Sequence, residues 1–465
     1  MRQTFNYRQK AREFFIVLLP IFITQLALMS TGFFDTVMAG HVSEADLAGV
    51  AIGSNLFFPF FGSSMGIISG LTPVVAQLYG AGRRDTIIFV VRQGFYWALG
   101  LAALFLLGGY LLVPSILQYL ELENRVVQVA SGYLMALSCG IVPVFLSSVL
   151  RNFIDALGFT RVTMLVTLCI VPVNVLMNYV FIFGWAGVPA LGGIGAGVGT
   201  AIAFVFNFLL NVLVVRFCAP FSSYRLFACV LRPSLAEWRK QLAVGIPIGC
   251  TMFCEQSIFG AVGLLMTVYG TEIVAAHQAA MSFTTVAYTV PMSVSMALTI
   301  LIGYELGARR LQDAREYRRL GWGLAVLFSM GVASFLVAFR MELAGLYTRG
   351  AGLEEVIAAF LVYAIFMQLA DGIDAPLQGI LRGYKDVRAT FGLAVLSYWG
   401  IGLPLGWGLA KFGGFGPYGY WIGLITGLLS GAVLLCLRLH KVERSFALRL
   451  QTAAIANEGS AQKEK

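Results

Sequence analysis

Apolar stretches of about 20 residues or more recur along the chain, and each is long enough to cross a bilayer as a helix. Only 12% of the residues are charged, whereas soluble domains average roughly 25%. The sequence therefore predicts an all-α polytopic membrane protein with twelve transmembrane helices. The predicted spans lie at 14–39, 49–78, 87–113, 127–149, 160–184, 193–216, 239–267, 274–304, 320–340, 354–380, 389–410 and 418–437.

The distribution of Lys and Arg residues predicts the orientation of these spans. With the N-terminus inside, the outer loops hold only Arg125, Arg340, Arg349 and Lys411 of the 32 basic residues, and Arg92 lies within the third span. Cytoplasmic loops carry such an excess of positive charge, so both termini are predicted to be cytoplasmic. The net charge of +9 is explained by these loops and does not indicate nucleic acid binding.

A weak internal repeat divides the chain into two halves of six spans. A shift of 227 residues aligns Pro20 with Pro247 and Met65 with Met292 without gaps, and LRNFID (150–155) resembles LRGYKD (381–386). An even number of spans gives both halves the same orientation, which predicts a parallel repeat with a substrate site between the halves. The predicted parts are an N-terminal bundle (1–216), a cytoplasmic linker (217–238), a C-terminal bundle (239–440) and a polar tail (441–465). We expect disorder from residue 450 onward.

Four acidic residues fall inside predicted spans, which are Asp35, Glu255, Asp371 and Asp374. An ionised acid at the centre of a membrane helix costs roughly 2.5–3.5 kcal/mol or more, so it needs a proton, a cation or water. No Lys or Arg lies deep in a span. This pattern favours the binding of a proton or a metal cation over structural salt bridges.

Glu255 and Asp371 are both predicted to lie near the midplane of the membrane. Glu255 is about 15 residues from the inner end of its span and Asp371 is about 17 residues from the outer end of its span, at a rise of roughly 1.5 Å per residue. Gln368 shares a helical face with Asp371, and Asp374 lies one turn nearer the cytoplasm. These residues predict a site for H⁺ or Na⁺ in the second half, with Glu255 and Asp371 as the Na⁺ ligands. The alternative is that protonated acids bond neighbouring helices.

A second candidate site lies in the first half. Asn174 and Asn178 are four residues apart on one helical face after Pro172, and Asp35 lies in the outer half of the first span. One carboxylate with two amide oxygens suits a proton or a hard cation. The alternative is that the Asn side chains hold helices together.

The acids do not follow the repeat. Asp35 lies opposite Val262, and Glu255 lies opposite Leu28. The LRNFID and LRGYKD alignment places Asp371 opposite Gly140. The sequence therefore predicts a duplicated scaffold whose halves have different functions.

Other features favour packing. GGIGAGVG (192–199) follows no predicted strand and lacks the GKS or GKT of a nucleotide loop, so it predicts close helix contact. His277 is interpreted as a packing or interfacial residue. Arg151 and Arg382 at inner span ends are interpreted as contacting lipid. The seven cysteines include no CxxC and are expected to be reduced and buried. No catalytic motif is present, so no enzyme activity and no cofactor are predicted.

Together, FFDTVMAG (33–40), PVVAQLYGAG (73–82), PALGGIGAGVGTAI (189–202), CEQSIFGAV (254–262), IVAAHQ (273–278) and LRGYKD (381–386) resemble the multidrug and toxic compound extrusion family, in its NorM-type bacterial branch. The resemblance covers nearly the whole chain. It implies two bundles around a central cavity, in an antiporter that exports cationic amphipathic drugs in exchange for Na⁺ or H⁺. It also implies a monomer in the bacterial plasma membrane.

The resemblance implies roles for individual residues as well. Asp35, Glu255 and Asp371 match the family's acids of the first, seventh and tenth spans, and Asn174 and Asn178 match its first-half asparagines. One position departs from the pattern, because Met367 stands where relatives can carry a Tyr four residues before the tenth-span Asp. This departure weakens the case for Na⁺ in the second half.

Two other function classes remain as alternatives. A lipid-linked saccharide flippase would require deep Lys or Arg residues to hold pyrophosphate. An ion channel would require a continuous selectivity filter. The sequence shows neither feature, so cation-coupled drug antiport is the favoured hypothesis.

Overall fold

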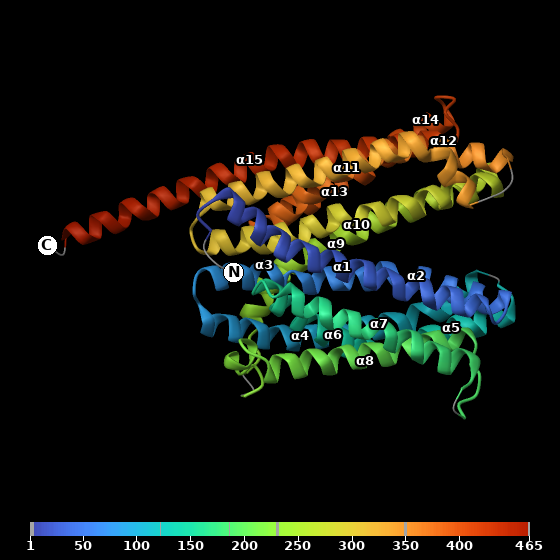
Figure 1. Cartoon of the computed structure of the whole chain (residues 1–465), viewed down its shortest axis with the longest axis horizontal. Coiled ribbons are helices and arrows are strands. Elements are labelled where there is room, and N and C mark those ends of the chain that lie inside the picture. The colour runs from blue at the N-terminus through green and yellow to red at the C-terminus, as the bar shows by residue number, and fades with distance from the viewer. Residues whose placement is uncertain (1–3, 121, 186, 229–231, 348–350, 464–465) are drawn as a thin grey trace. The chain divides into compact units, whose positions relative to one another are not determined.

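The computed structural model describes residues 4–120, 122–185, 187–228, 232–347 and 351–463, which form helices and contain no strand. The helices of the first half are α1 (Tyr7–Gly40), α2 (Glu44–Ser69), α3 (Leu71–Gly80), α4 (Arg84–Tyr119), α5 (Asn124–Ser138), α6 (Ile141–Ala156), α7 (Thr160–Phe183) and α8 (Gly193–Phe217). Those of the second half are α9 (Leu235–Met266), α10 (Thr271–Gly307), α11 (Leu311–Tyr347), α12 (Ala351–Gly383), α13 (Val387–Val395), α14 (Leu403–Lys411) and α15 (Tyr418–Lys463) (Figure 1).

The number of membrane spans agrees with the prediction. Eleven helical segments of the described chain are long and apolar enough to cross a membrane, and the pair α5–α6, bent by 48°, supplies a twelfth as a broken span. Here α2 and α3 count as one span, as do α13 and α14 with the π-helical segment Leu396–Gly402 between them. The all-helical fold class is therefore confirmed.

The helix boundaries repeat along the chain at a nearly constant shift of 227 residues. The helices α2, α4, α5 and α7 begin at residues 44, 84, 124 and 160, and α10, α11, α12 and α13 begin at 271, 311, 351 and 387. Left-handed turns recur at the same shift, with Gly82 (φ +69°) matching Arg309 (φ +60°) and Gly158 (φ +84°) matching Lys385 (φ +60°). The backbone therefore carries the duplication more clearly than the side chains do.

This constant shift corrects one part of the predicted repeat. Because Gly158 and Lys385 occupy equivalent turns, LRNFID and LRGYKD are not equivalent segments, and their alignment with a larger shift was wrong. The counterpart of Asp371 is then Val144 and not Gly140. Both counterparts are uncharged, so the inference that the acids are not duplicated stands.

The described residues form two compact units. The first contains Leu19–Phe253, and the second contains Cys254–Lys465 with the described residues of Arg2–Leu18. Their boundaries differ from the predicted bundles 1–216 and 239–440. The beginning of α1 belongs to the second unit, and the beginning of α9 belongs to the first. The division into units therefore also follows the repeat. The first helix of the first half begins in the second unit, and the first helix of the second half begins in the first unit.

Within the first unit, α2 and α9 cross through paired glycines. Gly66 on α2 faces Gly249 on α9, and Gly70, which directly follows α2, faces Gly245 on α9. A Cβ atom added at Gly70 would lie 2.5 Å from the Gly245 Cα atom. Small residues four apart allow such close approach of two membrane helices. The Ser63 hydroxyl also donates to the Gly249 carbonyl at 3.0 Å. This crossing fixes the first part of α9 in the first unit.

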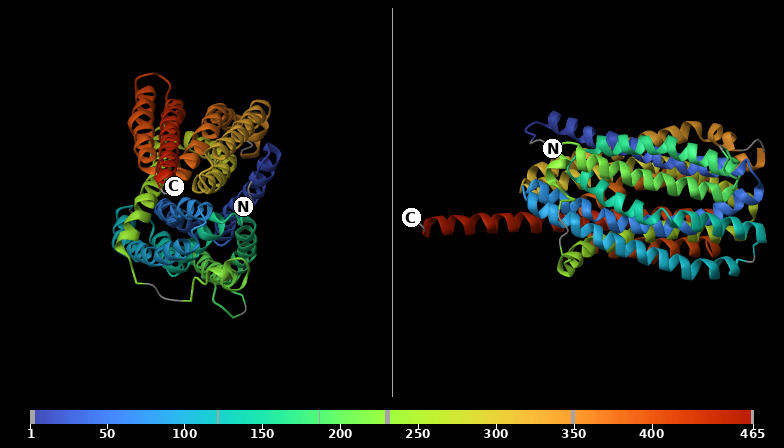
Figure 2. Two further views of the ribbon diagram at one scale, coloured as in Figure 1. Left: turned by 90° about the vertical axis from the view of Figure 1, so that its left-hand side faces the viewer. Right: turned by 90° about the horizontal axis from the view of Figure 1, so that it is seen from below.

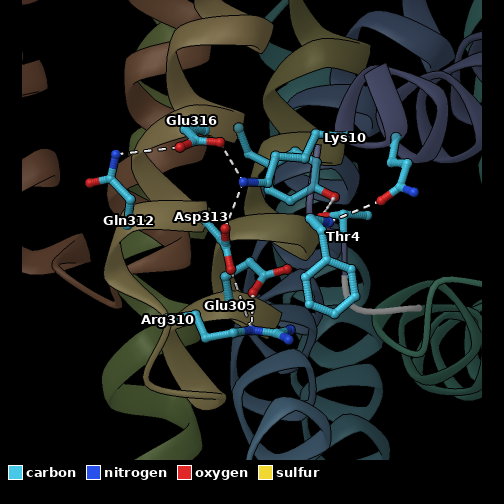
Figure 3. A network of polar contacts seen from close by, with 10 residues as sticks. Thr4, Lys10, Glu305, Arg310, Gln312, Asp313 and Glu316 are labelled. Atoms are coloured by element: carbon cyan, nitrogen blue, oxygen red, sulfur yellow. Dashed lines mark hydrogen bonds and ion pairs between the residues drawn. The ribbon is translucent and has the colours of Figure 1, made fainter. Parts of the chain in front are cut away.

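Within the second unit, ionic contacts hold the beginning of α1 (Figure 3). The buried ammonium of Lys10 donates to Asp313 at 2.6 Å and also to Glu316, both on the first turns of α11. Arg310, between α10 and α11, bonds Glu305 at 2.6 Å. Acids in the first turn of α11 are favoured by its helix dipole, and Lys10 compensates their charge. The start of α1 is therefore attached to the α10–α11 turn.

The C-terminal region differs from the prediction. α15 continues to Lys463 and extends past the other helices of its unit, as Figure 2 shows. The expectation of disorder was therefore wrong for residues 450–463, and residues 464–465 lie outside the described residues. Residues 441–463 contain no proline and are rich in strong helix formers such as Ala, Leu, Gln and Lys, which continue the helix begun by the apolar span.

The expectation of buried cysteines was also wrong. Cys139, Cys169 and Cys218 are exposed, and Cys250, Cys254 and Cys436 are only partly buried. Cys229 lies outside the described residues. The outer face of a membrane bundle contacts lipid, so an apolar side chain there gains nothing from burial inside the protein.

Candidate functional site

A buried polar cluster in the first unit contains Asp35 on α1, Asn174 and Asn178 on α7, and Thr200 on α8. The Asn178 amide donates to Asp35 Oδ1 at 2.5 Å, and the Thr200 hydroxyl donates to Asp35 Oδ2 at 3.1 Å. The Asn174 amide donates to Thr200 Oγ1 at 3.1 Å. The structure therefore brings together the three residues that the sequence predicted for this half, and adds Thr200.

Glycines on α8 make this cluster geometrically feasible. Gly195 and Gly199 face α7, and a Cβ atom at Gly199 would lie 2.2 Å from Asn178 Oδ1. The start of α8 is fixed by Asp46 of α2, which accepts a hydrogen bond from the Gly193 N–H at 2.7 Å. The predicted packing function of GGIGAGVG is thus seen in the structure, and it places Thr200 beside Asp35.

This first cluster offers several oxygen acceptors to a cation. Asp35 contributes a carboxylate that is 6% exposed, and Asn178 Oδ1 is buried without a hydrogen-bond partner among the described residues. Carboxylate and amide oxygens are ligands for hard cations. The same carboxylate can instead take a proton, because hydrocarbon surroundings favour the neutral form.

A second buried cluster lies in the second unit and contains Glu255 on α9, Asp374 and Gln378 on α12, and Tyr398 in the π-helical segment. The Gln378 amide nitrogen donates to Glu255 Oε1 at 2.6 Å and to Asp374 Oδ2 at 2.8 Å. The Tyr398 hydroxyl donates to Asp374 Oδ2 at 3.2 Å and lies 3.5 Å from Glu255 Oε1. Two carboxylates thus share the same two donors.

Local backbone irregularities position these side chains. Pro376 lies between Asp374 and Gln378 in α12 and lacks the N–H that would bond the Gly372 carbonyl. Tyr398 belongs to the π-helical turns Leu396–Gly402. Such π-helical turns are rare and occur often at functional sites. The equivalent helix of the first half, α7, has no such segment.

The sequence predicted Asp371 as the partner of Glu255, but the structure places other residues in contact with Glu255. Asp371 is buried and lies within electrostatic range of Asp374 and Glu255, but the direct contacts of Glu255 are to Gln378 and Tyr398. Gln368 is buried beside Asp371 in the helix, and neither atom of its amide has a hydrogen-bond partner among the described residues. Tyr288 of α10 lies close enough to Glu255, Asp371 and Asp374 to interact electrostatically with all three.

A basic side chain also reaches this cluster, contrary to expectation. The Arg382 guanidinium donates to Gln378 Oε1 at 3.2 Å, which links it through one amide to Glu255 and Asp374. The interpretation of Arg382 as a lipid-contacting residue did not include this contact. The same interpretation was incomplete for Arg151, which lies 3.6 Å from Asp155. In both cases the long side chain turns toward a protein group one helical turn away.

Sequence reasoning missed Thr200, Gln378 and Tyr398. Gln378 carried a usable signal, because it is a polar residue one turn beyond Asp374 on the same face of an apolar helix. Thr200 and Tyr398 carried no such signal. His277, by contrast, packs against Trp421 and Phe360 and accepts a hydrogen bond from the Trp421 indole at 3.0 Å, as the packing interpretation expected.

The chemistry that these clusters can perform is reversible cation binding. The first cluster has one carboxylate that accepts hydrogen bonds from neutral donors. The second has two nearby carboxylates, which cannot both stay ionised cheaply without a cation. Among the described residues, no group of three or more His, Cys, Asp or Glu side chains is placed to hold one metal ion. The duplicated helical fold with these two clusters is that of a multi-span membrane transporter.

Comparison with known proteins identifies its family. The family model described as MatE matches the chain twice, over residues 20–180 and 247–407. The two matches are displaced by the same 227 residues that separate equivalent helices, which confirms the duplication. The chain belongs to the multidrug and toxic compound extrusion (MATE) family, whose members are transporters and not enzymes.

Individual relatives agree with this assignment. A Bacillus licheniformis protein named "Probable multidrug resistance protein NorM" is 47% identical over 446 residues, which cover 96% of this chain and 99% of the relative. A Bacillus subtilis protein of the same name is 47% identical over 447 residues, with the same coverage. The chain is thus similar to NorM-type members of the family over nearly its full length.

Solved structures support the fold. The Vibrio cholerae MATE transporter VcmN in its bent form superposes with a TM-score of 0.83 at 21% identity and covers 95% of this chain and 99% of its own. The outward-facing form of a multidrug resistance MATE family transporter gives a TM-score of 0.85 at 16% identity, with coverage of 96% and 100%.

Proposed function

We propose that this transporter exports cationic amphipathic drugs in exchange for H⁺ or Na⁺ by alternating access. The observation that carries the proposal is the second-unit cluster, in which Glu255 and Asp374 share the donors Gln378 and Tyr398. A coupling cation requires a site whose charge changes during the cycle. Two adjacent carboxylates that bind and release one cation meet that requirement.

The Asp35 cluster is proposed as a second cation site with Asn174 and Asn178. Asp371 and Gln368 are proposed to complete the second-unit site when a cation or drug is bound, because the Gln368 amide has unsatisfied atoms and Asp371 is buried nearby. Drug binding and cation binding would then favour different conformations, which is the thermodynamic basis of antiport.

The proposed setting is the bacterial plasma membrane, with both termini in the cytoplasm. The support is the bias of Lys and Arg residues toward one side of the spans and the names of the bacterial relatives. We propose a monomer. A reporter fused after Lys465 that fluoresces only in the cytoplasm tests the orientation, and a silent fusion would reverse it.

The function is tested with purified protein in vesicles loaded with a cationic amphipathic dye. An imposed H⁺ or Na⁺ gradient should drive dye efflux, and the active gradient identifies the coupling ion. Efflux should be abolished in Glu255→Gln and strongly reduced in Asp371→Asn and Asp35→Asn. It should be unchanged in Asp85→Asn, which alters an exposed acid outside the clusters. Normal gradient-driven efflux in Glu255→Gln would refute the assigned site.

A further inference from the structure

A groove of about 290 Å³ lies beside the end of the last apolar span, between α15 and the turn that joins α12 to α13. The turn contributes Tyr384, Lys385 and Asp386, and α15 contributes residues from Arg438 to Arg449. The predicted span ends at residue 437, so the groove begins where the chain leaves the hydrocarbon. It is separate from both acid clusters described above.

The residues of α15 in the groove form two adjacent rows at helical spacing. Lys441, Ser445 and Arg449 make one polar row, and Arg438 begins a second row that continues with Val442 and Phe446. The rim of the groove is therefore cationic, and its floor includes apolar side chains. The Phe446 ring also packs edge-on against Tyr384, with ring centroids 5.9 Å apart.

The acids near the groove already have basic partners. Asp386 accepts two hydrogen bonds from Arg438, at 2.6 and 2.9 Å. Glu443 is buried against Arg315 and Arg318, at 3.4 and 3.2 Å. In the described part of the chain, no acidic side chain forms an ion pair with Lys441 or Arg449. The groove consequently carries positive charge that these acids do not compensate.

The turn that borders the groove differs between the two halves of the chain. Lys385 has a left-handed backbone (φ +60°) where the first half has Gly158. A non-glycine residue in that conformation is locally strained.

We propose that this groove binds the phosphate of an anionic phospholipid in the membrane leaflet that borders it. Basic pockets at the cytoplasmic ends of membrane helices suit such head groups. Lys441 and Arg449 would pair with phosphate oxygens, and the Ser445 hydroxyl would donate to them. Val442 and Phe446 would contact the glycerol and upper acyl region. This apolar floor favours a lipid over a soluble phosphate. Assignment to the inner leaflet rests on the proposed orientation, whereas lipid binding itself does not.

The test uses the purified full-length protein in a neutral detergent. Micelles containing phosphatidylglycerol or phosphatidylcholine are added in increasing amounts. The melting temperature of the protein is recorded at each step, and native mass spectrometry measures the lipid that stays bound. Phosphatidylglycerol should raise the melting temperature more and should be retained at least ten times more tightly. The double variant Lys441→Gln/Arg449→Gln should lose this preference. The matched control Arg444→Gln removes an exposed charge of α15 outside the groove and should keep it.

Other outcomes would overturn the proposal. These are equal retention of the two lipids, or an equal loss of preference in Arg444→Gln, which would indicate general attraction to a basic helix. If millimolar inorganic phosphate raises the melting temperature as much as phosphatidylglycerol does, the groove binds a soluble anion and not a lipid. The variant Lys441→Arg/Arg449→Lys keeps the charges and should keep the lipid preference, which separates binding from any folding defect.

Discussion

At the scale of single residues, the second-unit cluster depends on one amide group. The Gln378 nitrogen contacts Glu255 and Asp374, and its oxygen accepts a hydrogen bond from Arg382. A change in the charge of either acid therefore alters the hydrogen bonding of one side chain that also contacts Arg382. No other residue of the cluster is bonded to both acids and to a cation in the described contacts.

We predict that Gln378→Leu weakens cation coupling without unfolding the protein. Each hydrogen bond to a charged group contributes about 1.5–3 kcal/mol, so the apparent affinity for the coupling ion should change roughly 10–100-fold. Dye efflux measured against the concentration of the coupling ion tests this expectation. Gln128→Leu changes an exposed glutamine and should leave the dependence of efflux on ion concentration unchanged. The same unchanged dependence in Gln378→Leu would contradict the role given to the amide.

At the scale of helices, the two halves attach their first helices differently. α9 is attached to α2 through glycines in direct contact, whereas the beginning of α1 is attached to α11 through the ammonium of Lys10. The first attachment is a close backbone packing and the second is ionic. We expect the two to respond differently to substitution.

Gly249→Leu should disrupt the crossing of α2 and α9. A Cβ atom at this position would lie 2.5 Å from Ile67 Cγ1 and 2.6 Å from the Ser63 carbonyl oxygen, and overpacking of this kind typically costs about 1–3 kcal/mol. The melting temperature of the purified variant should fall. Gly260→Leu is the control on the same helix, because a Cβ atom there would meet nothing within 4 Å. Equal melting temperatures for the two variants would be the contrary result.

Lys10→Met should loosen the beginning of α1. Loss of the ammonium leaves Asp313 and Glu316 without this partner, and charge-assisted hydrogen bonds of this type contribute about 1.5–3 kcal/mol. Hydrogen exchange of residues 7–18 should accelerate. Lys240→Met removes a lysine that is 76% exposed and 3.7 Å from Glu237, a surface pair worth about 0–1 kcal/mol. Unchanged exchange in Lys10→Met would show that the ionic contacts do not hold the helix.

At the scale of the whole molecule, the compact units do not coincide with the two halves of the sequence. The first unit extends to Phe253 and so includes the beginning of α9. The acid clusters nevertheless stay within single units, with Asp35 in the first and Glu255 in the second. The two units thus share a duplicated set of helices but carry different polar residues.

This division predicts how fragments behave. A fragment of residues 1–228 lacks the part of α9 that packs on α2, whereas a fragment of residues 1–266 contains it. Expressed alone in membranes, the longer fragment should resist limited proteolysis markedly better. If the two fragments are digested at equal rates, the crossing of α2 and α9 does not stabilise the first unit.

The sequence by itself determined the all-helical class, the spans, the duplication and the position of each acid along its helix. These features depend on hydrophobic length and residue order, which are local properties of the chain. Tertiary structure alone decided which side chains meet. It placed Asp374 and Gln378 beside Glu255, Thr200 beside Asp35, and Arg382 within reach of the acids. Those contacts depend on helix rotation, glycine packing and a π-helical segment, and the pattern of one helix carries no information about its neighbours.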